Sequence, residues 1–166
     1  MPKKTYTQIN SVTLAASSST VTFSSLPQNF RDLVLIASAA STGGGTNAAV
    51  RFNSDSGSNY SRVLMGANGV GAVGTAAGTQ TGFQYDNWAF TTTTLGNSNH
   101  ILQIMDYSAT DKHKTILARA NRFGETIDAL AGRWANTAAI TSVQVVSFSG
   151  ESYIAGSTFT LYGIEA

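Results

Sequence analysis

Residues 153–166, YIAGSTFTLYGIEA, are the part of the sequence that says most about the fold. Thr158–Ile164 mix aromatic, aliphatic and β-branched residues, the types that suit a half-buried, pleated strand. The Gly156-Ser157 pair before them supplies a turn, which allows this strand to pair with, or lie near, the apolar residues 140–148. The sequence therefore predicts that the chain closes on a β-strand of a compact module.

Composition extends this prediction to the whole chain. Its 166 residues are enough for one domain with a sizeable core. Only 11% of them are charged, and the polarity comes instead from serine and threonine, which stand beside 16 glycines. Since threonine favours strands and glycine, serine and asparagine favour turns, we expect an all-β chain with many loops. So little charge also suits lasting contact with other subunits, because few charged groups must lose water.

Charge and cysteine content argue against several function classes. The net charge is only +1, so no long-range field exists to hold a polyanion, and we expect no nucleic-acid partner. The chain has no cysteine, which removes disulfides and thiolate metal sites and fits synthesis in a reducing cytoplasm. The apolar residues 12–16 are too short for a signal peptide, and no run approaches the roughly 20 residues of a membrane span, so no membrane partner is expected.

Turn residues divide the chain into strand-length segments, about ten in all, with no segment periodic enough for a helix. The expected strands are residues 12–14, 21–23, 33–37, 48–53, 60–65, 83–90, 101–107, 115–120, 129–134, 140–148 and Thr158–Ile164. The first two are predicted to form one hairpin, and residues 48–53 and 60–65 a second. Residues 66–82 are predicted to be a long glycine-rich surface loop, and residues 1–20 an extended segment before a single β-sandwich domain at 21–166.

Several blocks taken together carry a family resemblance. They are FSSLP (23–27), DLVLI (32–36), VRFNSDSGSNY (50–60), IMDYS (104–108), KT (114–115), GRW (132–134), AITS (139–142) and AGSTFTLYGI (155–164). In this order they resemble a widespread group of tailed-bacteriophage virion proteins, found as small structural proteins and as modules of fibres. The resemblance spans nearly the whole chain from Val21 onward.

The resemblance implies an antiparallel β-sandwich of jelly-roll type that works as a non-enzymatic virion component, often a homotrimer. It brings no catalytic residues, cofactor or metal. The leading hypothesis is a capsid decoration or cement protein that self-associates and clamps neighbouring copies of the phage major capsid protein. Its place would be the capsid surface of the virion, after synthesis in the cytoplasm of the host bacterium.

The N-terminal segment is a candidate anchoring arm. An extended chain can add a strand to the exposed sheet edge of a partner, where backbone hydrogen bonds give affinity and side chains fix the register. On this hypothesis Lys3, Tyr6 and Ile9 contact the partner.

Two glycine-containing motifs imitate known sites. Gly69 to Gly74 has the G-x-G-x-x-G spacing of a dinucleotide loop, but the residues that follow cannot supply the required helix, so a plain loop is favoured. Asn53, Asp55 and Asn59 are spaced like oxygen ligands of calcium, but a single carboxylate and no terminal glutamate favour a turn held by Asx hydrogen bonds.

Catalytic groups show no convincing arrangement. His100 and His113 are interpreted as ordinary surface or interface histidines, because no serine stands in a nucleophile motif. Four carboxylates could in principle form a glycosidase pair, but nothing in the sequence makes any two face each other: Asp86, Asp106, Asp128 and Glu151. We therefore predict no enzymatic activity.

Aromatic and basic residues leave one alternative open. Tyr85 and Trp88 could stack on sugar rings, which would make the protein a fibre or head-fibre module that binds host surface glycans. Trp134 is expected to fill the core instead. The basic clusters, Lys112 with Lys114 and Arg119 with Arg122, are expected to be solvated turns or contacts between subunits.

Overall fold

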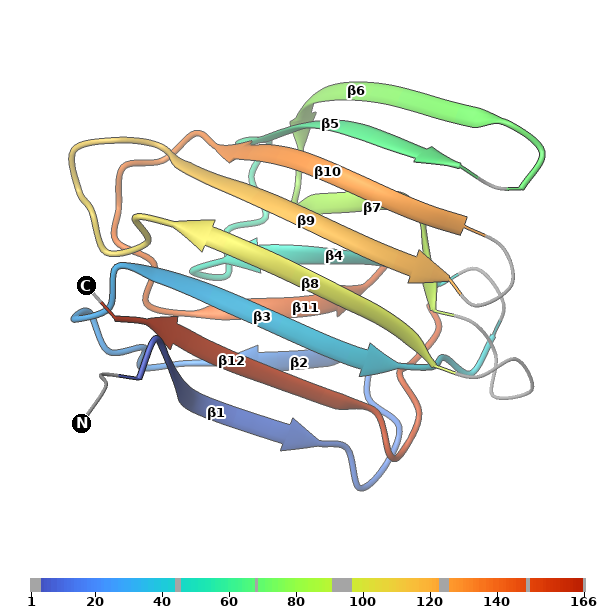
Figure 1. The fold of residues 1–166 in the computed structure, drawn as a ribbon, viewed down its shortest axis with the longest axis horizontal. Coiled ribbons are helices and arrows are strands. Elements are labelled where there is room, and N and C mark those ends of the chain that lie inside the picture. The colour runs from blue at the N-terminus through green and yellow to red at the C-terminus, as the bar shows by residue number, and fades with distance from the viewer. Residues whose placement is uncertain are drawn as a thin grey trace.

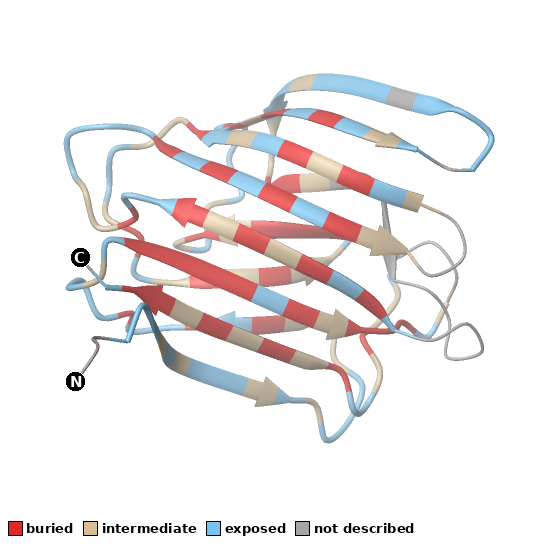
Figure 2. Cartoon of the chain, viewed as in Figure 1, coloured by how far each residue is buried: buried red, intermediate tan, exposed pale blue. Residues whose placement is uncertain are grey.

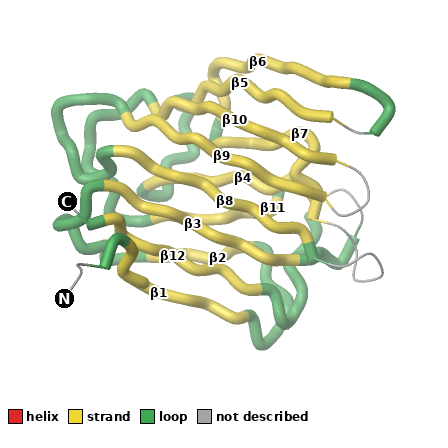
Figure 3. The backbone as a smooth tube through the Cα atoms, in the orientation of Figure 1, coloured by secondary structure: helices red, strands yellow, loops and turns green. Residues whose placement is uncertain are grey.

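The computed structural model describes residues 4–43, 46–67, 69–90, 97–122, 126–148 and 150–165, without the side chains of residues 46, 47, 73 and 85–90. These ranges contain twelve β-strands and no helix, so none that could cross a membrane (Figures 1 and 3). The strands are β1 (Tyr6–Thr13), β2 (Thr20–Phe23), β3 (Asp32–Ala39), β4 (Thr46–Phe52), β5 (Tyr60–Ala67), β6 (Ala72–Gln80), β7 (Phe83–Phe90), β8 (Ser98–Met105), β9 (Lys114–Arg122), β10 (Thr126–Trp134), β11 (Val143–Ser147) and β12 (Thr158–Ile164).

The strands form two antiparallel sheets that pack face to face, which confirms the predicted β-sandwich. The large sheet has eight strands in the order β1-β12-β3-β8-β9-β10-β5-β6. The small sheet has four, in the order β2-β11-β4-β7. In Figure 1 the large sheet lies in front of the small one. Because the sheets differ in width, β7 packs against β9, β10 and β5, whereas β6 packs mainly against its neighbour β5.

Alternation along the strands places the core between the sheets. β9 buries every second residue, and Figure 2 shows the same banding on its neighbours. At one end of the core Phe52, Tyr60, Phe83 and Trp134 form an aromatic cluster, with ring centroids of Tyr60 and Phe83 5.0 Å apart. A Cβ on Gly132 would stand 2.5 Å from Cε1 of Phe83, so only glycine leaves room for this cluster. The prediction that Trp134 fills the core is confirmed.

The closing strand has the predicted bounds, Thr158–Ile164. Its partners differ from the expectation, because it pairs with β1 and β3 in the large sheet. The apolar residues 140–148 contribute β11, which belongs to the small sheet. Pairing of Tyr6 with Ile164 also brings the two ends of the described chain to one side of the molecule (Figure 1).

Both predicted hairpins are wrong, although their strands exist. β1 pairs with β12 while β2 pairs with β11, so these two strands lie in different sheets. Likewise β4 belongs to the small sheet and β5 to the large one. The turns between them therefore carry the chain across the sandwich. Local patterns indicate a strand but do not say which sheet buries its apolar face.

The predicted glycine-rich loop is also wrong. Residues within 66–82 form the end of β5 and all of β6, which pair antiparallel from Tyr60 with Gln80 to Ala67 with Ala72. Backbone hydrogen bonds to β5 hold β6 in place, so it needs no large apolar side chains. From Tyr6 onward the N-terminal segment forms β1, a strand of the chain's own large sheet, which it borders.

Candidate interaction surface

The outer face of the large sheet, the side that points away from the small sheet, carries exposed apolar side chains. Leu117 is 57% exposed and Met65 is 64% exposed. Alternation along each strand puts the following exposed apolar residues on this face: Tyr6, Ile36, Val63, Met65, Met105, Leu117 and Ile127. Apolar residues scattered singly are ordinary on a surface, but a contiguous group marks an interaction site.

Strand register brings four of these residues, Ile36, Val63, Met65 and Leu117, into two cross-strand rows. One cross-strand row runs through Val34, Gln103, Leu117, Ala131 and Val63. The next row runs through Ile36, Ile101, Arg119, Ala129 and Met65. Directly opposed residues on one face lie about 5 Å apart, so each row is a continuous strip. Between them they cross five neighbouring strands, β3, β8, β9, β10 and β5.

Exposed charge on the outer face is sparse and of one sign. Arg119 and Arg133 are its exposed charged residues within the described part of the large sheet. The one carboxylate there, Asp32, is 5% exposed and accepts hydrogen bonds from the backbone N–H of Asp106 and from Nε2 of Gln103. The face is therefore largely apolar over β3, β8, β9, β10 and β5, with two accessible guanidinium groups, and polar over β12 and most of β1.

The outer face is broad and only slightly hollowed. Eight strands about 4.8 Å apart and about 24 Å long give a surface of roughly 800 Å², similar to the area that one partner buries in a standard protein interface. A shallow depression of about 380 Å³ lies near its centre, lined by Tyr6, Val34, Ile101, Leu117 and Arg119 among others. Such a shape suits another protein surface better than an enclosed small molecule.

The structure separates the three predicted arm residues. Tyr6 is 55% exposed and belongs to the outer face. Ile9 instead is half-buried and packs against the core. Its side chain turns inward where a bulge between Gln8 and Asn10 interrupts the pairing of β1 with β12. Lys3 lies outside the described residues.

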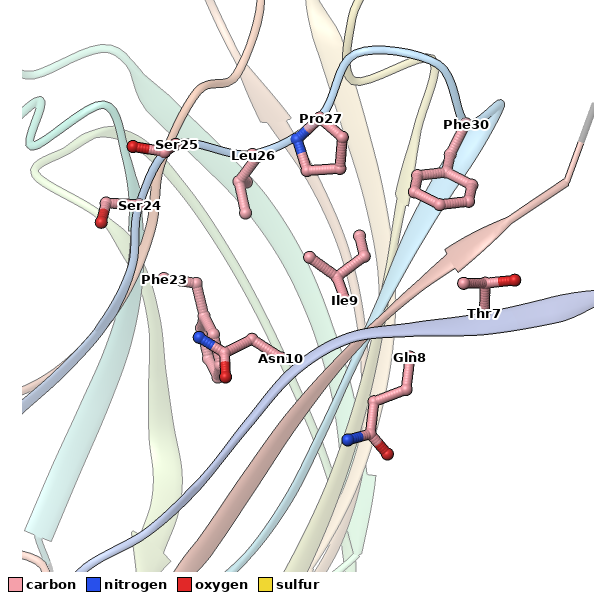
Figure 4. A pocket seen from close by; sticks show the side chains of 10 residues that line it. All are labelled: Thr7, Gln8, Ile9, Asn10, Phe23, Ser24, Ser25, Leu26, Pro27 and Phe30. Atoms are coloured by element: carbon pink, nitrogen blue, oxygen red, sulfur yellow. The ribbon is translucent and has the colours of Figure 1, made fainter.

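A second depression of about 380 Å³ opens between β1 and the segment after β2. Figure 4 shows Ile9 directed toward Leu26, Pro27 and Phe30, with Gln8 pointing away. Its walls combine these apolar groups with uncharged hydroxyl and amide side chains. We interpret it as the packing site that holds β1 to the sandwich.

The Asx turn predicted between β4 and β5 is confirmed, because Oδ1 of Asp55 accepts a hydrogen bond from the backbone N–H of Gly57 at 2.8 Å. Oδ1 of Asn53 accepts hydrogen bonds from the backbone N–H groups of Thr141 and Ser142, at 2.8 and 3.1 Å. The carboxylate of Asp55 accepts one from Nε1 of Trp134 at 2.7 Å and one from Nδ2 of Asn59 at 2.9 Å. Partial burial raises the pKa of Asp55, but these hydrogen bonds outweigh burial and lower the pKa overall.

Two basic groups expected at the surface are buried. His100 is 3% exposed on the core side of β8, and burial lowers its pKa to about 3. Lys114 is fully buried, and its Nζ donates hydrogen bonds to the backbone carbonyls of Lys112 and Thr137, at 3.0 and 3.2 Å. Burial lowers the pKa of Lys114. The sequence does not reveal that these two side chains are buried. Lys114 is the first residue of β9 and points toward the core, and His100 occupies an inward position of β8. His113 is exposed, as expected.

The candidate catalytic carboxylates have separate surroundings. Asp106 forms an ion pair with Lys112 at 3.3 Å, and Glu151 accepts a hydrogen bond from the hydroxyl of Thr42 at 2.6 Å. Asp128 is buried on the core side of β10. The side chain of Asp86 lies outside the description. No cluster of three or more metal-binding side chains occurs among the described residues.

The glycan alternative rests on residues of β7. The backbone places Tyr85 and Trp88 in the small sheet, next to β4. Their side chains lie outside the description, so their role stays a prediction.

No protein-family model and no curated protein matches the sequence. Among solved structures, the galectin LEC-6 of Caenorhabditis elegans is similar at 8% identity and a TM-score of 0.39, over 95% of this chain and 96% of that one. The alginate lyase Aly36B is similar at 13% identity and a TM-score of 0.39, over 94% of this chain and 81% of the lyase. Since identities and TM-scores are this low, neither protein's activity is transferred to this chain.

The sequence analysis does not predict the apolar outer face, although the sequence contains a pattern that indicates it. A strand with one buried face needs apolar residues only at alternate positions. Here the pairs Ile116-Leu117 and Ile101-Leu102, and the triplet 63–65, are apolar at consecutive positions, so each puts apolar side chains on both faces of the sheet. When several strands carry apolar residues at both alternating positions, both faces of the sheet are apolar, and this indicates that the outer face is also a surface to be covered.

Proposed function

We propose that the protein is a non-enzymatic structural component of a tailed-phage virion, a decoration protein on the capsid surface. The observation that supports this best is the outer face of the large sheet, which is broad, apolar and nearly free of charge. A monomer in water gains nothing from such a face, whereas a protein that functions by assembly buries it. The sequence resemblance to phage virion proteins supplies the class of assembly.

We further propose that the outer face docks on subunits of the major capsid protein. Its five apolar strands, about 4.8 Å apart and about 24 Å long, cover roughly 500 Å², and the flanking polar strands bring the face to the roughly 800 Å² of one side of a standard interface. Arg119 and Arg133 would meet carboxylates of the partner, because the face has no exposed acidic group of its own among the described residues. The partner surface should therefore combine apolar residues with acidic ones at the rim, and binding should weaken as salt is raised.

Binding of the purified protein to capsids that lack it tests this function. A carboxylate in the centre of the face, Leu117→Glu, should weaken co-sedimentation with capsids about 30-fold, since it must be desolvated against apolar neighbours. Val63→Glu, on the same cross-strand row, should act in the same direction. The matched control is Val70→Glu, which adds the same charge at an exposed apolar residue between β5 and β6, outside the face.

Two results would contradict the proposal. One is capsid binding that both outer-face variants leave intact. The other is absence of capsid binding together with specific binding on a glycan array that Trp88→Ala abolishes, which would favour the fibre module instead.

A further inference from the structure

We propose that two copies of this chain pair edge to edge through β6, antiparallel, to form one continuous sheet. This inference is separate from the docking of the outer face and assigns a function to a different part of the molecule, the free edge of the large sheet.

β6 has one edge and two faces that no other described strand covers. β5 occupies one edge, and no described strand pairs with the other. Residues on both of its faces are exposed, including Gly74, Thr75 and Ala76. The small sheet ends at β7, which packs against β9, β10 and β5. Among the described residues, no strand pairs with the outward backbone N–H and C=O groups of the regular stretch 72–77, the condition that invites another strand.

The other sheet edges carry features that discourage pairing, and the regular part of β6 does not. β1 is interrupted in its middle by the bulge between Gln8 and Asn10. β2 has only four residues, and the pairing of β7 with β4 is irregular near Asn47. β6 pairs regularly with β5 from Ala72 to Ala77, and its own irregularity lies beyond that stretch. It contains no charge and no proline, the residues that natural edges use against association.

A second copy fits this edge for reasons of charge and symmetry. An uncharged strand meets its own copy without repulsion. A two-fold axis perpendicular to the sheet sets β6 against β6 antiparallel, which continues the all-antiparallel pattern of the large sheet. The same axis keeps both outer faces on one side, so a pair would present two docking faces to one shell and gain avidity.

The size of the contact sets its strength. Six regularly paired residues make a line of contact about 20 Å long, less than a standard interface. We therefore expect a reversible dimer that grows with concentration. The family resemblance implies an assembly of three copies, whereas a two-fold contact gives assemblies with an even number of copies. The number of copies in the assembly therefore discriminates between the two.

Sedimentation velocity from about 1 µM to about 1 mM measures this equilibrium. Wild-type protein should shift from monomer to dimer. Ala76→Lys and Thr75→Lys should each weaken the dimer at least about tenfold, because each brings two ammonium groups together across the two-fold contact. The two substitutions lie on opposite faces of β6, so only pairing through the edge is sensitive to both. Gln8→Lys, which adds the same charge to the exposed surface of β1, should leave the dimer unchanged.

Amide hydrogen exchange provides the second readout. The amides of residues 72–77 that point away from β5 should exchange more slowly at high than at low concentration, and this difference should vanish in Ala76→Lys. A monomer at every concentration, a trimer, or a dimer that ignores both β6 variants would overturn the proposal. A dimer that fails to bind capsids would leave it intact and contradict only the proposed function.

Discussion

At the scale of single residues, Asp55 and Trp134 join two distant parts of the chain. The indole Nε1 of Trp134, at the end of β10, donates to Oδ2 of Asp55 in the turn before β5. This fixes the edge of the aromatic cluster, where Trp134 packs on Phe52 at 5.6 Å between ring centroids. The Asn53–Asn59 turn, whose spacing resembles a calcium loop, thus holds the end of β10 to the segment before β5.

Asp55→Ala should destabilise the fold by about 2 kcal/mol, because it removes a hydrogen bond to a charged acceptor and leaves the indole N–H of a buried tryptophan without it. Urea unfolding at neutral pH measures the loss. The folded pKa of Asp55 is lowered below 3.8, so its contribution is present above that pH and is lost as the pH falls through the folded value. The difference between wild type and variant should therefore shrink in acid. Asp111→Ala, at an exposed aspartate, is the control.

His100 should make stability depend on pH over a different range. Its pKa is about 3 in the fold and 6.5 in the unfolded chain, so the unfolded state binds the proton more readily. Stability is then complete above pH 6.5 and falls as the pH drops toward the folded value. We expect a loss of about 2 kcal/mol between about pH 7 and about pH 5 in wild type. His100→Gln should lack this slope and His113→Gln should keep it; equal slopes in all three proteins would refute the assignment.

At the scale of elements, the sequence predicted strands well and their partners poorly. Residues 33–37 and Thr158–Ile164 were predicted as strands from local composition, and both are found in β3 and β12. Whether β4 pairs with β5 depends on contacts between residues far apart in the chain, which no local pattern encodes. β6 was missed for a related reason, since its alanines and glycines gain their strand conformation from the neighbouring β5.

Deletion of residues 1–10 should lower the Tm by about 5–10 °C, because it removes most of β1, the core contact of Ile9 and the pairing that covers β12. Calorimetry measures the shift, and light scattering should report new association through the bared edge of β12. Deletion of residues 1–4, which precede β1, should change neither quantity. A truncated protein as stable as wild type would show that β1 is dispensable.

At the scale of the whole molecule, the two sheets differ in their number of strands, eight against four, and their surfaces differ accordingly. The narrow sheet completes the core, while the broad one also presents an apolar exterior. From the sequence, low charge predicted contact with other subunits, but it did not predict the apolar outer face that we propose for such contact. Leu117 and Val63 become neighbours of one strip only through the register of β9, β10 and β5, which is a property of the folded sheet.

The pairing of Tyr6 with Ile164 bears on how the molecule can be modified. Because both strand ends leave the same corner of the large sheet, a peptide fused before β1 or after β12 would emerge at nearly the same point (Figure 1). A short linker could equally join the two ends and let the chain be opened at an exposed turn elsewhere. The molecule thus offers a single attachment corner for fused peptides.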